Sequence, residues 1–193
     1  MKKTKLFILF VAGIMNLMPL VCSCEGQDDG TTCASLQKAS DKAKEVIAEA
    51  LPDAKLAEIN GIEIAADGSL TAYGEWTFYY FREIGNDYTF QAVSIQPNCK
   101  ERHWNPGGSI TFTEIPCLTN SQDWISMADQ IMNENQRSFS SRTMQVFADE
   151  DDIFPGADII TYVYFYNDPD GEHTAYIVLD AETNAILQVE LNP

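Results

Sequence analysis

Positively charged side chains are scarce in this chain. Its 193 residues contain 12 lysines and arginines against 29 aspartates and glutamates, which gives a formal net charge of −17. Three of the lysines lie among the first five residues, so the chain after residue 23 has nine basic and 29 acidic residues, a net charge of −20. A field of this sign repels nucleic acid phosphates and anionic lipid head groups. We therefore expect no nucleic acid among the partners.

Histidine is also scarce, with only His103 and His173 in the sequence. A structural zinc site takes four ligands, and Cys99, His103 and Cys117 have no fourth His or Cys close in the sequence. A Cys–His nucleophile pair needs an exposed thiolate beside the imidazole, and no flanking motif supports one for Cys33. The sequence therefore predicts no catalytic residues, no metal and no cofactor.

The acidic turns lack the pattern of a calcium loop. Asp149–Asp152 and Asn167–Gly171 gather carboxylates, but neither has alternating Asp or Asn positions followed by a glutamate at the correct offset. No pair of carboxylates stands out for glycoside hydrolysis either. We expect solvated acidic turns here, with bound calcium as the alternative.

The N-terminus has the pattern of an exported lipoprotein. An apolar run, Leu6–Val21, follows the three lysines and is short for a membrane span. Val21, Ser23 and Cys24 then match the lipobox, with a branched residue at −3 and a small one at −1. We expect residues 1–23 to be a lipoprotein signal peptide and Cys24 to carry the lipid. A plain secretory signal, or an uncleaved anchor, is the alternative.

The segment after Cys24 predicts where the protein is displayed. Residues 24–34 are polar and contain the acidic stretch Glu25–Gly30, which cannot form a core and predicts a flexible tether. The stretch resembles the acidic export signal of Bacteroidetes surface lipoproteins. That resemblance implies an outer-membrane, lipid-anchored protein at the cell surface, with a periplasm-facing position as the alternative.

Three further cysteines suit an oxidising compartment. Cys99 and Cys117 lie at the two ends of a loop-rich stretch, and closing a loop of that size stabilises a fold by roughly 3 kcal/mol. We predict a Cys99–Cys117 disulfide, which leaves Cys33 over. The alternative is that all three are reduced and partly buried.

The hydrophobic periodicity predicts an α+β fold. Spacings of three and four indicate helices, and alternation of apolar and polar residues indicates strands. We expect two tandem units, each with one helix packed on an antiparallel sheet of three to four strands. The first unit spans 35–98, with a helix over 35–51 that Pro52 ends and strands near 56–64, 70–81 and 88–95. A connecting loop with a short strand at 110–115 spans 99–119, and the second unit spans 120–193, with a helix over 120–135 and strands near 144–148, 159–166, 174–179 and 185–191.

The end of the chain resembles a known family. Tyr176–Leu187 reads YIVLDAETNAIL, which is similar to the closing hairpin of PepSY-type domains, with Asn184 in place of the usual glycine. Asparagine is the next-best residue for a left-handed turn position, so the turn is expected to survive. Ala43–Pro52 resembles the helix–proline entry of the same family. The resemblance, which extends to tandem β-lactamase-inhibitor-type proteins, implies binding or inhibition of a protein partner, often a peptidase.

One segment stands out as a contact surface. Arg102, His103 and Trp104 bring cationic and aromatic side chains together in an otherwise acidic chain, and Trp and Arg are enriched at interface hot spots. The alternative is that Trp104 folds back over an end of the sheet.

These expectations favour a non-enzymatic lipoprotein that binds or inhibits an extracytoplasmic protein. A hydrolase or carbohydrate-handling accessory lipoprotein is the alternative, and it predicts a deep pocket with converging ionisable groups. A structural envelope component is the third hypothesis.

Overall fold

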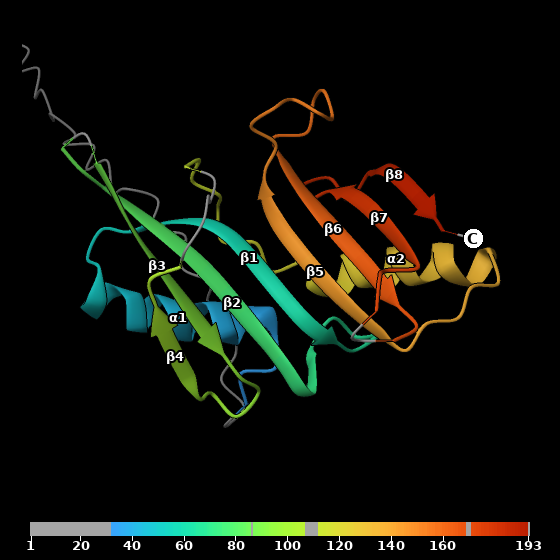
Figure 1. Ribbon diagram of the computed structural model, residues 1–193, viewed down its shortest axis with the longest axis horizontal. Coiled ribbons are helices and arrows are strands. Elements are labelled where there is room, and N and C mark those ends of the chain that lie inside the picture. The colour runs from blue at the N-terminus through green and yellow to red at the C-terminus, as the bar shows by residue number, and fades with distance from the viewer. Residues whose placement is uncertain (1–31, 86, 107–111, 169–170, 193) are drawn as a thin grey trace, which may run out of the picture.

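The computed structural model describes residues 32–85, 87–106, 112–168 and 171–192 (Figure 1). The expected signal peptide and Cys24 lie outside these residues. Over the described part of the chain the elements are α1 (Leu36–Ala50), β1 (Lys55–Ile64), β2 (Leu70–Ile84), β3 (Asp87–Ile95), β4 (Glu101–Trp104), α2 (Ser121–Glu134), β5 (Ser141–Ala148), β6 (Ile159–Tyr166), β7 (Ala175–Asp180) and β8 (Ile186–Leu191). The predicted α+β class is confirmed.

The strands belong to one continuous sheet. Within the described residues it has eight strands in the order β4-β3-β2-β1-β5-β6-β7-β8, and each neighbouring pair is antiparallel. At its centre β1 pairs with β5, and Glu58 lies opposite Phe147. The strands that we assigned to two sheets are therefore hydrogen-bonded to each other.

Both α1 and α2 lie on the same side of the sheet (Figure 1). Ser35 caps α1 by accepting a hydrogen bond from the Lys38 amide at 3.4 Å. The main core fills the space between the helices and the sheet and includes Trp76, Phe165 and Trp124, none of which is exposed. Among the described residues, neither helix combines the length and apolar character needed to cross a lipid bilayer.

Strand alternation gives the sheet a second apolar surface. On β6, Val163 and Phe165 point into the main core, so Tyr162 and Tyr164 point to the opposite side. We call this side, which points away from α1 and α2, the distal face. A second cluster is centred there on buried Ile160 with Ala157 and Val178, and its half-buried members are Phe147, Phe154, Tyr162, Tyr176 and Leu187.

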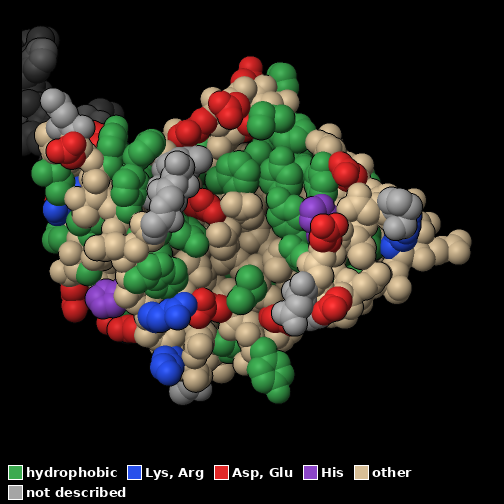
Figure 2. Space-filling model, in the orientation of Figure 1, with side chains coloured by type: hydrophobic (Ala, Val, Ile, Leu, Met, Phe, Trp, Pro, Cys, Tyr) green, Lys and Arg blue, Asp and Glu red, His purple; other side chains and the backbone are tan. Residues whose placement is uncertain are grey.

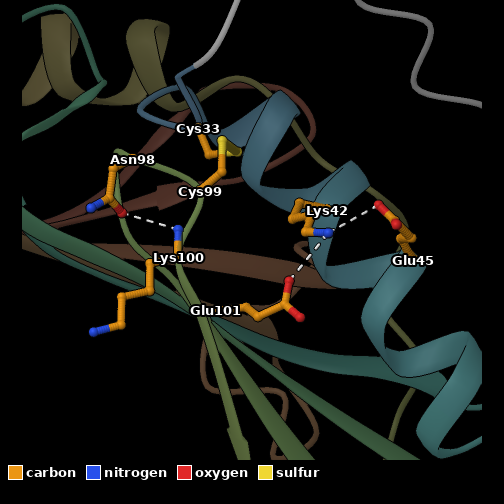
Figure 3. A network of polar contacts seen from close by, with 7 residues as sticks. All are labelled: Cys33, Lys42, Glu45, Asn98, Cys99, Lys100 and Glu101. Carbon is orange, nitrogen blue, oxygen red and sulfur yellow. Dashed lines mark hydrogen bonds and ion pairs between the residues drawn. A yellow bond between two sulfur atoms is a disulfide. The ribbon is translucent and has the colours of Figure 1, made fainter.

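The predicted Cys99–Cys117 disulfide is wrong, because Cys99 is bonded to Cys33 (Figure 3). The segment before α1 runs beside the turn between β3 and β4, where the Cys33 amide donates to the Pro97 carbonyl at 2.8 Å. This contact brings the two Cα atoms to 5.0 Å, within disulfide reach. The Cys117 sulfur lies 3.4 Å from the Ser40 hydroxyl.

The last residues of the expected tether are part of the fold. Cys33 is buried, and the Ala34 carbonyl accepts hydrogen bonds from the Leu70 amide at 2.9 Å and the Trp76 indole at 3.0 Å. A segment held by a disulfide and these hydrogen bonds is not flexible. Cys33 and Ala34, which we placed in the tether over 24–34, therefore belong to the fold.

The connection between β3 and α2 also differs from the prediction. Glu101–Trp104, which we placed in a loop, forms strand β4 against β3. Of the strand expected at 110–115, residues 110 and 111 lie outside the described residues and 112–115 are not in a strand. Instead, buried Ile115 joins the main core, and its amide donates to the Leu56 carbonyl at 2.8 Å. Apolar packing rather than strand pairing explains the hydrophobic signal there.

Candidate functional site

The most distinctive surface of the protein is an aromatic group on the distal face over β5–β7. The alternation of β6 places Tyr162 and Tyr164 side by side, with ring centroids 5.6 Å apart and ring planes within 15°. Tyr176 on β7 lies opposite Tyr164 in the strand register, with centroids 6.0 Å apart. We call this group the tyrosine patch; it consists of Phe147, Tyr162, Tyr164, Tyr166, His173 and Tyr176.

The tyrosine patch is open to solvent on one side. Each of its members is half-buried, because the rings pack edge to edge and face to face on the sheet. Figure 2 shows hydrophobic side chains gathered over β5–β7, with acidic side chains at the margin and a hollow beside them at the centre of the face. A contiguous apolar surface on the face of a sheet is a candidate interaction site.

Hydrogen bonds hold one edge of the tyrosine patch in place. The Tyr176 hydroxyl donates to the Glu190 carboxylate at 2.5 Å and accepts from the Gln188 amide at 2.8 Å. The bond to Glu190 raises the pKa of Tyr176 to about 12, and burial raises the pKa of Tyr164 to about 12. These phenols therefore stay neutral at physiological pH. They are suited to packing and hydrogen bonding rather than to nucleophilic chemistry.

The carboxylates of the acidic loop at the end of β5 accept hydrogen bonds from backbone amides. Asp149 accepts hydrogen bonds from the Ile153 amide at 3.1 Å and the Phe154 amide at 2.7 Å. Glu150 accepts from the amides of Phe112 and Thr113 at 3.1 and 3.0 Å. These carboxylates organise the loop. In the part of the chain that the structure describes, no three His, Cys, Asp or Glu side chains are grouped to hold a metal ion.

A second aromatic cluster lies at the other end of the distal face. Phe112 packs against Tyr88, Phe90 and Phe81 with centroid distances of 4.4, 5.4 and 6.4 Å. The sequence pattern did not identify it, because Phe112 is in a loop that Glu150 holds from across the sheet. The central strand β1 lies between the two aromatic clusters.

The three predicted contact residues do not form a common surface. In β4 alternate side chains point to opposite faces, so Arg102 and Trp104 share one face and His103 has the other. The Arg102 guanidinium lies 4.8 Å over the Trp104 ring and 3.8 Å from the Glu75 carboxylate. Glu101, which shares the face of His103, is instead 3.2 Å from Lys42 of α1 (Figure 3). Arg102 and Trp104 therefore lie on the distal face, at the edge opposite the tyrosine patch.

A cavity of about 350 Å³ lies on the helix side, between the end of α1 and the start of β1. Buried Tyr80 lines it, and the Tyr80 hydroxyl has no hydrogen-bond partner among the described residues. Burial raises the pKa of this phenol. The other lining residues mix apolar and oppositely charged side chains, including Ile47, Leu56, Lys44 and Glu114.

The chain matches no model of a known protein family, no curated protein and no solved structure. The resemblance of Tyr176–Leu187 to PepSY-type domains stays a prediction. The turn within it has the geometry that the sequence implied, because Asn184 adopts a left-handed φ of 62°.

Proposed function

We propose that this protein is a non-enzymatic binding module that holds an extracytoplasmic protein against the distal face of its sheet. The observation that carries the proposal is the half-buried tyrosine patch on the side away from the helices. Tyrosine offers a large contact area with few rotatable bonds, so it loses little conformational entropy on binding. Aromatic anchors of this kind contribute most of the affinity at protein interfaces.

The chemistry of the patch favours binding over catalysis. The phenols of Tyr164 and Tyr176 have raised pKa values, and the nearby carboxylates of Asp149 and Glu190 are engaged in hydrogen bonds. A hydrolase would instead place a nucleophile or general base at the surface with a pKa near neutrality. The tyrosine rings also suit stacking against sugars, so a carbohydrate-handling accessory lipoprotein is the second candidate.

We propose that the module is anchored to the outer membrane, at the cell surface, by lipid on Cys24. The lipobox Val21–Cys24 and the acidic stretch Glu25–Gly30 support this position. Metabolic labelling with a fatty-acid analogue tests it: the parent chain should incorporate the label and Cys24→Ala should not. Equal labelling of the two chains, or no labelling of either, would contradict the anchor.

We further propose that the chain contains two tandem units, α1 with β1–β4 and α2 with β5–β8. The supporting observation is the mirrored strand order, in which β4-β3-β2-β1 meets β5-β6-β7-β8 through the first strand of each half. Such a junction turns two small sheets into one wide face. The tyrosine patch and the Phe112 cluster then lie on the second and first units respectively.

Capture of a partner through the patch tests the binding function. The purified full-length chain is immobilised, and proteins retained from an envelope fraction are quantified by mass spectrometry. Tyr162→Ser combined with Tyr164→Ser should reduce recovery of a specific protein at least about ten-fold. The control is Ser126→Ala with Asn133→Ser, two exposed positions of α2. Equal recovery by the parent, the tyrosine variant and the control would reject the distal face as the binding surface.

A further inference from the structure

The tyrosine patch lies in a part of the chain that has no lysine or arginine. From Thr143 to Pro193 the sequence contains eleven aspartates and glutamates, no lysine or arginine, and one histidine, His173. This segment supplies β6, β7 and β8 and therefore nearly the whole surround of the patch. The electrostatic field around the patch is therefore more strongly negative than that of the chain as a whole.

Carboxylates approach the patch from several elements. Glu190 of β8 bonds to Tyr176. Glu58 of β1 lies opposite Phe147 in the strand register and accepts a hydrogen bond from Gln145 at 2.8 Å. Asp149 at the end of β5 acts electrostatically on Tyr162 and raises the pKa of its phenol, after the larger effect of burial. The aromatic rings thus have negative charge on three sides.

Arginine side chains lie over two aromatic rings of this chain, and neither ring belongs to the tyrosine patch. Arg102 lies 4.8 Å over Trp104, and Arg142 lies 4.5 Å over Phe139. Arg142 is also committed to Asp129 of α2, with hydrogen bonds of 2.7 and 2.5 Å. Across the described residues, no Lys or Arg side chain lies over a ring of the tyrosine patch. Aromatic ring faces attract cations, so a partner can supply the cation that this chain does not.

We propose that the tyrosine patch binds a segment of its protein partner that presents arginine or lysine side chains. The inference rests on the proposed binding function and adds the chemistry of the segment bound. Aliphatic stems of these side chains pack on the rings while their charged ends face the surrounding carboxylates. Such binding weakens as ionic strength rises, because Glu190 at the margin is solvent-exposed.

Two matched peptides test the requirement for charge. The first is a labelled decapeptide of alternating arginine and serine, and the second replaces each arginine by citrulline, which keeps the shape and removes the charge. Binding to the purified full-length chain is followed by fluorescence anisotropy. The arginine peptide should bind at least about ten-fold more tightly than the citrulline peptide. Equal affinities would overturn the proposal.

Matched variants test whether the binding is local. Tyr162→Ser with Tyr164→Ser removes two rings without changing the charge and should weaken the arginine peptide about ten-fold; Phe at both positions should change its affinity less than about two-fold. Glu190→Gln should weaken it more than Glu134→Gln, which removes the same charge from the exposed surface of α2. The glutamate comparison keeps the test decisive if the serine variant does not fold. Equal effects of the two glutamate substitutions would show attraction by overall charge alone and would overturn the proposal.

The outcomes separate this inference from the binding function itself. If both peptides bind alike and the serine variant weakens both, the cationic requirement fails while the distal face remains a protein-binding surface. If neither peptide binds and partner capture is independent of the tyrosines, both proposals fail. Binding of a neutral glucose hexasaccharide that the serine variant abolishes, without peptide binding, would replace the basic segment by a glycan.

Discussion

The rings of Phe147 and Tyr162 lie 5.7 Å apart and within 8° of parallel on the distal face. The contact is diagonal, because Phe147 stands opposite Ile160 and Tyr162 stands opposite Gln145 in the pairing of β5 with β6. Packing of this kind keeps the rings in place before any partner arrives. A preformed surface loses less entropy on binding, which favours affinity.

The distal aromatic residues should matter more for binding than for stability. Phe147→Ala should lower the free energy of unfolding by about 1 kcal/mol, because the side chain is only half-buried. The matched control, Phe165→Ala, removes a fully buried ring on the helix side and should cost about 3–5 kcal/mol. Urea denaturation measures both values. Equal costs would mean that the distal face belongs to the folding core rather than to a binding surface.

The Cys33–Cys99 disulfide should be a major source of stability. It closes a loop over a sequence separation of 66 residues, and on the chain-entropy model this stabilises the fold by about 4 kcal/mol. Cys33→Ser with Cys99→Ser should lose an amount of that order by chemical denaturation. Peptide mapping without reduction should recover Cys33 linked to Cys99, and recovery of a Cys99–Cys117 link would contradict this arrangement.

The Tyr80 hydroxyl should destabilise the protein at high pH. Burial raises the pKa of this phenol above the value of about 10 in the unfolded chain. Below about pH 10 the phenol is neutral in both the folded and the unfolded chain, and the free energy of unfolding keeps its full value. As the pH rises from there toward the higher folded-state pKa, the free energy of unfolding falls. Tyr80→Phe removes the ionisable group and leaves no hydrogen bond broken among the described residues.

Tyr80→Phe should therefore be neutral or stabilising by up to about 1 kcal/mol near pH 7. Its advantage over the parent should grow near pH 11, which urea denaturation at the two pH values measures. A loss of stability near pH 7 would indicate that the hydroxyl has a partner. An advantage that does not change with pH would mean that Tyr80 titrates normally.

Substitution of Gly61 should destabilise the protein because the Trp76 ring lies beside it. A Cβ atom at position 61 would come within 2.3 Å of the Trp76 ring, which lies opposite in the pairing of β1 with β2. Gly61→Ala should cost about 1–3 kcal/mol through overpacking. In the background of Trp76→Leu the same substitution should cost less, and thermal unfolding of the double-mutant cycle measures this coupling. Additive effects would contradict the contact.

The secondary structure was predictable because the local patterns agree with the sheet. The strand expected at 159–166 is β6, Ile159–Tyr166, where β-branched and aromatic residues coincide with alternation. The helix expected at 35–51 is α1, and Leu51 is its C-cap just before Pro52. The continuous sheet was not predictable, because the pairing of β1 with β5 joins residues far apart in the sequence. No local pattern encodes that pairing.

The candidate site was predictable only in part. The alternation of Tyr162, Tyr164 and Tyr166 is visible in the sequence, but their grouping with Phe147 and His173 depends on strand register. The pairing of Cys33 with Cys99 depends on the path of the chain before α1, which polar composition alone led us to treat as a tether. The composition of Arg102–Trp104 indicated a contact surface, but strand β4 places these side chains on two different faces of the sheet.

The most direct test places a photo-crosslinking amino acid at Tyr164 and, separately, at the exposed Ser126 of α2, in the full-length chain on intact cells. After irradiation, the Tyr164 position should yield a discrete protein adduct, and the peptide cross-linked to it should contain arginine or lysine. The Ser126 position should yield no such adduct. An adduct of the same protein from Ser126 alone, or no protein adduct from Tyr164, would contradict the role of the distal face in binding.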